Sequence, residues 1–300
     1  MKRSQLLRFY EQGYRDFTGV DLSGVDLSGV MLIAVDLTAA NLTGTNLSRA
    51  FLTNSNLSQA KLHRANLSFA KMSEIDLQQA DLSKANLYGA FMVKSRLSEA
   101  KLSGADLSHT NLRAANLAAA NICGAKLQKV NLRQANLEQT NLNWANLQQA
   151  RLTGARMQNA SLTGINLSQT FLIDVDLSGT ELAGIDFSQA KLTRANLRYS
   201  NLSNANLSNA LMRQVNLNNA NLTKANLAHA DLSRASLRQA NLSYANLIQA
   251  NLDDANLESA VLHSAILETV PQNMAGLLSQ VNNNVNLPQL NPVHQQIRFA

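Results

Sequence analysis

The sequence predicts a repeat fold in which the chain turns within every five residues around one continuous apolar interior. A large apolar residue recurs at every fifth position from Phe17 to Leu267. These 51 centres are all Leu, Met, Phe or Ile, and no insertion changes their register. A small or β-branched residue, most often Ala, stands two positions before most centres, with Asn or Asp usually between them. Each unit therefore supplies one bulky and one small apolar residue to the interior.

A period of five residues fits neither an α-helix nor a flat strand. On a helix, successive centres would scatter around the axis. On a strand, an odd period would expose every second centre. The glycines indicate where the chain turns, because eleven of the thirteen stand two positions after a centre, where a corner can require a positive φ.

Units such as Ala65-Asn66-Leu67-Ser68-Phe69 resemble the A(D/N)LXX signature of the pentapeptide-repeat family, and they cover residues 17–268 almost completely. The resemblance implies an all-β fold, a right-handed quadrilateral β-helix of about 13 coils with four units in each coil. It also implies that the centre and the residue two before it face inward, while the other three positions face solvent. Stacked at a strand spacing of about 4.8 Å, the coils would make a rod about 60 Å long.

Both ends of such a rod are expected to be capped, because open backbone edges invite pairing with another molecule. We expect residues 1–16 to hold a short cap helix over residues 4–13, with Ser4 as its N-cap and Gly13 just after its end. This segment resembles the cap helix of pentapeptide proteins from cyanobacteria. Residues 17–270 would then form the β-helix of 51 repeats. Residues 271–300 would form a C-terminal cap or flexible tail, with a short helix over 274–281.

Composition argues against other classes of protein. The chain is 45% hydrophobic, too apolar for disorder, and no apolar run has the length of a membrane span. The lone Cys123 argues against a disulfide scaffold and a four-cysteine zinc site. The N-terminal segment lacks the apolar core of a signal peptide, so we expect a cytoplasmic protein.

Catalytic chemistry is not expected, because a filled β-helix has no pocket and its inward positions carry almost no titratable groups. The histidines of the repeats stand one or two positions after centres, where side chains should point outward: His63, His109, His229 and His263. His63 and His263 would lie about 48 Å apart, and the other two about 29 Å apart. We therefore expect no enzyme, no cofactor and no metal site.

One side of the predicted β-helix carries unusual apolar residues. The position before the centre, normally Asn or Asp, is apolar five times within residues 17–257, always at spacings that are multiples of twenty: Met31, Phe51, Phe91, Phe171 and Leu211. On the same side, the position after the centre is apolar at Ile33, Val93 and Ile173. Exposed apolar patches rimmed by charge often mark interfaces, although scattered exposed apolar residues also occur without any function.

The same side is basic between residues 91 and 213, where seven cations stand against the single acid Asp174: Lys94, Arg113, Arg133, Arg151, Lys191, Arg194 and Arg213. From these observations we define a predicted partner face: Met31, Ile33, Phe51, Phe91, Val93, Arg113, Arg133, Arg151, Phe171, Ile173 and Leu211. The preferred function is that of a non-catalytic protein-protein interaction rod with an acidic partner. It resembles cyanobacterial pentapeptide proteins that modulate regulatory partners, including those of cell differentiation.

Two alternatives involve nucleic acid. DNA mimicry, the mode of topoisomerase-binding members of the family, requires a dense anionic surface. The net charge is instead +6, and the continuous acidic stretch is short: Asp16, Asp21, Asp26 and Asp36. Direct binding of nucleic acid through the basic face is allowed by charge, but it usually needs interleaved aromatic residues, and the Phe residues are expected to lie apart from the Arg cluster. The oligomeric state stays open between a monomer and an end-to-end dimer.

Overall fold

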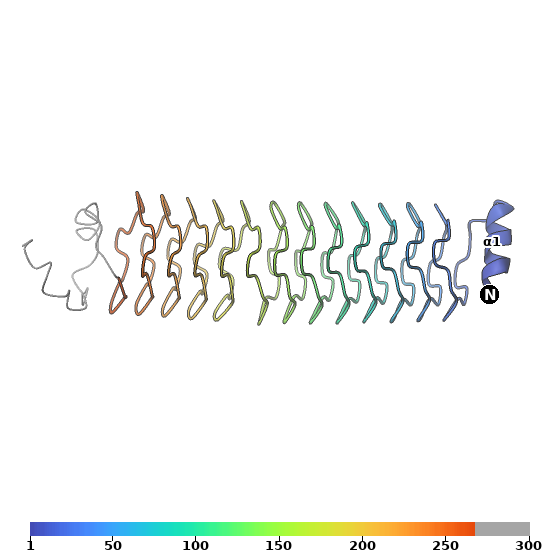
Figure 1. Cartoon of the computed structure of the whole chain (residues 1–300), viewed down its shortest axis with the longest axis horizontal. Coiled ribbons are helices and arrows are strands. Elements are labelled where there is room, and N and C mark those ends of the chain that lie inside the picture. Colours follow the sequence, from blue (N-terminus) through green and yellow to red (C-terminus); the bar gives the residue numbers. More distant parts are fainter. Residues whose placement is uncertain (268–300) are drawn as a thin grey trace, which may run out of the picture. The chain divides into compact units, whose positions relative to one another are not determined.

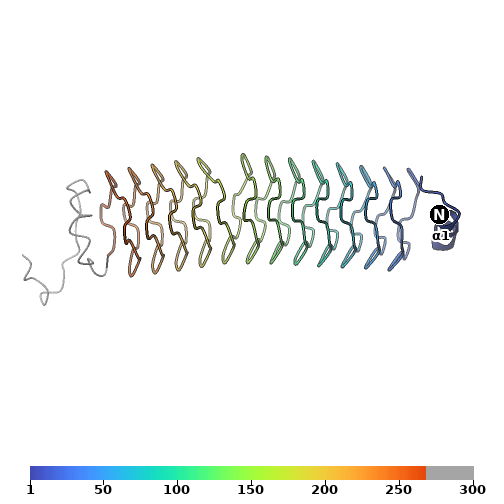
Figure 2. The same ribbon diagram turned by 90° about the horizontal axis from the view of Figure 1, so that it is seen from above.

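The structure, a computed structural model, describes residues 1–267 of the 300-residue chain. Two compact units make up the chain, Met1–Asp176 and Leu177–Ala300, and the described residues of each include a stack of coils (Figures 1 and 2). The predicted repeat region 17–270 therefore runs through both units. The C-terminal segment 271–300, with its predicted helix 274–281, lies outside the described residues. No helix within residues 1–267 is long and apolar enough to cross a membrane.

Each coil uses twenty residues, as the resemblance implies. Isolated parallel bridges join equivalent positions of successive coils, for example Asp21 to Asn41 in the first unit and Asn201 to Asn221 in the second. Within residues 1–267 every rung is such a single-residue bridge, and no longer strand forms. The reason is geometric, since each five-residue unit must also make a corner.

A β-turn closes the unit at each corner. The N–H three residues after a centre donates to the carbonyl of that centre, as from Ala40 to Leu37 at 3.0 Å. The residue before that donor has a positive φ, +55° at Ala39 and +64° at Gly44, as the third residue of a type II turn does. Glycine thus marks the corners as predicted, but most corners use other residues. Their cost of roughly 1–2 kcal/mol is offset in part by an inter-coil bond, such as Ala39 N–H to the Ser58 carbonyl at 2.9 Å.

The interior contains the centres and the residues two positions before them, as expected. Every centre from Phe17 to Leu262 is buried, and typical Ala residues such as Ala65 are fully buried. Where Thr replaces Ala, its hydroxyl has a partner, as Thr45 Oγ1 donates to the Leu22 carbonyl at 2.8 Å. One ladder of Leu and one of small residues therefore fill each side of the coil without unsatisfied polar groups.

The other three positions are less exposed than expected. The Asn side chains before the centres are half-buried because they stack in ladders: Asn66 Nδ2 donates to Asn46 Oδ1 at 3.2 Å, and Asn66 Oδ1 accepts from the Ser68 N–H at 3.1 Å. Two serines that follow centres, Ser108 and Ser168, are buried. Many side chains at these three positions are therefore only partly exposed, and the expectation that all three positions face solvent is wrong for them. The reason is that the close coil spacing lets equivalent side chains cover one another.

The helix α1 (Arg3–Glu11) lies at the start of the first unit (Figure 1), within the segment predicted for it. Its N-cap is Lys2 and not Ser4, because the Lys2 N–H donates to the Gln5 side chain at 3.0 Å and the helix begins earlier. Gly13 follows the C-cap with a φ of +95°, as predicted. Leu6 is the residue of this helix that is buried.

The first coil has no coil before it to donate hydrogen bonds to its carbonyl groups. Residues of the N-terminal segment donate to some of these carbonyls instead. Between coils, the N–H of a centre donates to a carbonyl of the next coil, as from Leu22 to Asn41 at 2.8 Å. In the first coil, four carbonyls on the open side accept instead from the N-terminal residues: Asp21 from the Met1 amino group (2.5 Å), Asp26 and Ser28 from Arg3 (3.4 and 3.5 Å) and Ile33 from Tyr10 (3.4 Å). These bonds support the proposed capping role of residues 1–16.

A substitution in the column of small residues tests whether the interior is full. Ala115 is 1% exposed, so Ala115→Leu should destabilise the protein by about 1–3 kcal/mol through overpacking. Ala118→Leu is the matched control, because Ala118 follows a centre and is only half-buried. Urea unfolding followed by circular dichroism measures both variants. Equal effects of the two substitutions would contradict a filled interior.

Carboxylates before the centres make the fold sensitive to acid. Burial by itself would raise the pKa of Asp81, but hydrogen bonds from Ser83, one of them from its N–H at 3.0 Å, outweigh burial and lower the pKa. The positive charges of His63 and Lys101 lower it further. Because the folded pKa lies below the unfolded one, the stabilisation is complete above the ordinary aspartate pKa, about 3.9, and is lost as the pH falls through the folded value.

We expect Asp81→Asn to lose less thermal stability than the unchanged protein between about pH 6 and about pH 3, since the amide still accepts the Ser83 N–H and does not titrate. Thermal melts followed by circular dichroism at several pH values measure the difference. A loss of equal size in both proteins would rule out this contribution of Asp81.

Candidate functional site

The first unit brings most of the predicted partner face onto one side. A single ladder of bridges contains, in order, Met31, Phe51, Lys71, Phe91, Asn111, Asn131, Arg151 and Phe171. The residues that follow the buried centres of these same rungs include Ile33, Val93, Arg113, Arg133 and Ile173. Leu211 lies in the second unit, on a ladder with Lys191 and Asp231.

The apolar members of this face differ in exposure. Met31 and Phe91 have 55% and 50% of their surface exposed, and Ile33 and Leu211 are also exposed. The remaining apolar members are half-buried: Phe51, Val93, Phe171 and Ile173.

Cations of neighbouring rungs explain part of this burial. Lys71 Nζ lies 4.6 Å from the ring centroid of Phe51, and Arg151 Cζ lies 5.9 Å from that of Phe171. Basic and aromatic residues are therefore interleaved along the ladder, and the prediction that the Phe residues lie apart from the Arg cluster is wrong for Arg151 and Phe171. The side chains of Lys and Arg are long enough to cover a ring one rung away while their charges stay in water.

Two arginines form the basic centre of the face. Arg113 and Arg133 occupy the same position in consecutive coils, which the Ala114 N–H links by donating to the Arg133 carbonyl at 2.9 Å. Both are exposed, and within residues 1–267 neither has an ion-pair partner. Arg213 differs from the prediction, because its Nε pairs with Asp231 in the second unit.

Residues that the sequence did not point to complete the apolar part of this side. A groove of about 480 Å³ in the first unit is lined by Gly29, Arg49, Phe51, Phe69, Lys71 and Phe91. Gly29, Arg49 and Phe69 lie on the corner that precedes the partner-face rungs. When each residue is assigned to one of the four sides, the residues of this groove fall on two different sides, and the groove is not predicted. If each rung is instead grouped with the corner that precedes it, the sequence places Phe69 beside Lys71.

Phe69 is held in place by its neighbours in the next coil. Its ring meets the edge of Tyr88 at a centroid distance of 5.5 Å, and Tyr88 in turn lies 5.1 Å from His109. The ring also covers Gly89, because a Cβ added there would lie 2.8 Å from Phe69. With 47% of its surface still exposed, Phe69 presents a fixed apolar wall.

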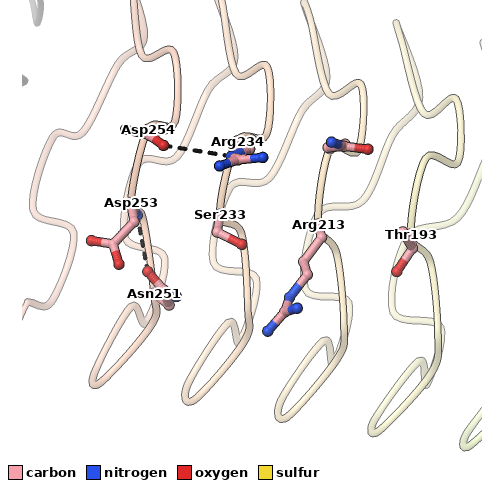
Figure 3. A pocket seen from close by; sticks show the side chains of 8 residues that line it. Thr193, Arg213, Ser233, Arg234, Asn251, Asp253 and Asp254 are labelled. Carbon is pink, nitrogen blue, oxygen red and sulfur yellow. Dashed lines mark hydrogen bonds and ion pairs between the residues drawn. The ribbon is translucent and has the colours of Figure 1, made fainter.

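The second unit holds a polar pocket of about 530 Å³, lined by Thr193, Arg213, Gln214, Ser233, Arg234, Asn251, Asp253 and Asp254 (Figure 3). Arg234 pairs with Asp254 at 3.5 Å, and the Asp253 N–H donates to Asn251 at 2.9 Å. Both arginines of this pocket are thus neutralised by neighbouring carboxylates. No histidine or cysteine is among the residues that line the pocket; its hydroxyl groups come from Thr193 and Ser233.

The titratable side chains considered at the sequence level lie on the surface. His109 and His229 are exposed, whereas His63 and His263 are half-buried. Cys123 follows the centre Ile122, a position expected to face solvent, but it is half-buried. Within residues 1–267 no three His, Cys, Asp or Glu side chains form a group that could hold a metal ion.

Twenty-residue coils with four corners and a Leu and Ala interior define a solenoid of the β-helix class. The sequence model for pentapeptide repeats matches this chain eight times, over residues 21–59, 36–68, 60–98, 95–134, 131–169, 172–209, 200–239 and 240–269. The chain belongs to the pentapeptide-repeat family, whose fold is a right-handed β-helix.

Three solved structures illustrate the relatives. HetL, a pentapeptide repeat protein involved in heterocyst differentiation regulation from the cyanobacterium Nostoc sp. strain PCC 7120, is 32% identical over 87% of this chain and 97% of its own, with a TM-score of 0.24. Rfr23 from the cyanobacterium Cyanothece 51142 is 25% identical over 54% and 92%, with a TM-score of 0.19. QnrB1, a plasmid-mediated fluoroquinolone resistance protein, is 15% identical over 88% and 90%, with a TM-score of 0.29.

HetL and Rfr23 are of the cyanobacterial type expected from the N-terminal segment. No curated protein matches the sequence.

The packing of Phe69 on Gly89 can be tested with a matched pair of glycines. Gly89 and Gly44 have nearly the same φ, +66° and +64°, but a Cβ at Gly44 meets nothing within 4 Å. We expect Gly89→Ala to cost about 1 kcal/mol more than Gly44→Ala, because the Phe69 ring must move. Thermal melts of the two variants compare the costs. Identical melting temperatures would mean that the ring does not rest on Gly89.

Proposed function

We propose that this protein is a non-catalytic binding protein that binds an acidic surface of another protein through the residues of the partner face in its first unit. The observation that carries the proposal is the pair Arg113 and Arg133, two exposed cations in consecutive coils with no ion-pair partner among residues 1–267. A role as a regulatory modulator in a cyanobacterium is the finer form of the same proposal.

The chemistry of the face suits a protein interface. Arginine and aromatic residues are enriched in such interfaces and supply most of their binding free energy. Here the exposed Phe91 stands two coils before Arg133, and Arg151 follows on the same ladder as Phe91. Because Arg113 and Arg133 form no ion pair among residues 1–267, an acidic partner would not have to displace an internal one.

Direct binding of nucleic acid is a second candidate, and the interleaving of Lys71 with Phe51 and of Arg151 with Phe171 favours it. DNA mimicry has less support, because it requires a dense anionic surface, whereas the net charge of the chain is +6. A mobility-shift assay with duplex and single-stranded DNA at several salt concentrations separates the two classes of partner. Binding that weakens steeply with salt would favour nucleic acid.

Charge reversal tests the proposed protein-binding face. The triple variant Arg113→Glu, Arg133→Glu and Arg151→Glu should reduce capture of protein partners from a native lysate by about tenfold or more, since each reversal replaces attraction with repulsion. Capture is measured by quantitative mass spectrometry of the bound proteins. The thermal melt should stay close to that of the unchanged protein, because all three side chains are exposed.

The matched control carries the same change of charge outside the partner face, as Lys61→Glu, Lys101→Glu and Lys126→Glu. These three lysines are also exposed and precede centres on other sides. We expect the control to capture partners as the unchanged protein does. Undiminished capture by the arginine variant would reject the face.

A further inference from the structure

We infer that the groove between Phe51, Phe69 and Phe91 is the anchor site of the partner face, and that it receives an aromatic or large aliphatic side chain from an acidic, extended segment of the partner. This inference rests on the proposed function and names the part of the partner that the face recognises. The two parts of the argument are the apolar walls of the groove and the charge of its rim.

The walls are apolar and come from two directions. Phe51 and Phe91 lie on the partner-face ladder, two coils apart, and Phe69 lies on the corner that precedes the rung between them. Gly29 leaves the end of the groove towards the N-terminus without a side chain. The volume of about 480 Å³ lies within the range of roughly 300–1,000 Å³ that binding pockets commonly show.

The rim of the groove is positively charged. Lys71 occupies the rung between Phe51 and Phe91, and Arg49 occupies the corner one coil before Phe69, to which it is linked by its N–H bond to the Ser68 carbonyl at 2.8 Å. Within residues 1–267 neither cation has an ion-pair partner. Glu74, the acid of the Lys71 coil on this side, stands at the following corner and does not line the groove. The complementary ligand is therefore apolar at its centre and anionic at its flanks.

The walls are also held in position before any partner binds. Tyr88 and Gly89 fix the ring of Phe69 from the next coil, and Lys71 covers one side of the Phe51 ring. A fixed wall loses little side-chain entropy on binding, so more of the contact energy appears as affinity. Lys71, Lys94 and Arg113 stand on three successive coils of this side, and they give the flanking carboxylates of an extended segment further partners.

A selection from a displayed library of random twelve-residue peptides on the full chain tests this inference. We expect the enriched peptides to combine acidic residues with at least one Phe, Trp, Leu or Met. Fluorescence anisotropy with the synthesised peptides should then show binding that is weaker by about tenfold or more in Phe69→Ala and in Lys71→Glu.

Two matched variants control for the loss of an exposed aromatic ring and for the reversal of charge. Trp144 is exposed and covers Gly164 of the next coil as Phe69 covers Gly89, but it lies outside the groove. We expect Trp144→Ala and Lys126→Glu to bind the peptides as the unchanged protein does. Phe69→Leu, which keeps an apolar wall, should retain more affinity than Phe69→Ala, and thermal melts confirm that each variant is folded.

The outcomes separate this inference from the proposed function. Enriched peptides that lack acidic residues, or that bind Phe69→Ala and Lys71→Glu as tightly as the unchanged protein, would overturn the groove assignment. If the triple arginine variant also loses its protein partners in that case, the partner face stands and only the groove fails. Displacement of the peptides by single-stranded DNA at equal salt would instead assign the groove to nucleic acid.

Discussion

The structure depends on one interaction, the backbone hydrogen bond that joins each centre to the next coil. The N–H of a centre such as Leu67 donates to the carbonyl of Asn86 at 2.7 Å, and the same bond recurs on all four sides of the coil. This bond holds equivalent residues at a fixed spacing of twenty positions, so that every side chain lies beside its own counterpart in the next coil. Columns of identical chemistry are the direct result, inside as ladders of Leu and Ala and outside as ladders of Asn.

The outward ladders show how a surface can change while the lattice stays intact. An Asn before a centre bonds both to its counterpart and to a nearby N–H, as Asn131 does with Asn111 at 3.1 Å and with the Arg133 N–H at 3.3 Å. On the partner-face ladder, Met31, Phe51 and Phe91 replace these amides, yet the backbone bridges continue through them. A function can therefore be placed on one column at small cost to the fold, because the backbone hydrogen bonds between coils continue whichever side chain stands at this position.

The groove arises where two columns meet across a corner. Phe69 belongs to one column and Lys71 to the next, and the turn between them brings both against Phe51 and Phe91. The regular lattice fixes the backbone on both sides of that corner, so the groove is built on rigid elements, which favours precise recognition. The polar pocket of the second unit differs from this groove, because its two arginines, Arg213 and Arg234, already form ion pairs with carboxylates.

The sequence by itself determined the period, the inward residues and the position of the corners, because one large apolar residue in every five must be buried and the residue two after it must accept a positive φ. It also predicted the single ladder of Met31, Phe51, Phe91 and Phe171, since equivalent positions recur every twenty residues. Only the tertiary structure decided the pairing of Arg213 with Asp231, the covering of Phe51 by Lys71, and the place of Phe69 in the groove. These contacts join residues about eighteen to twenty-two positions apart, either on one column, as for Lys71 and Phe51, or across a corner. They depend on the direction of each side chain and on the geometry of the corner, neither of which a five-residue period contains.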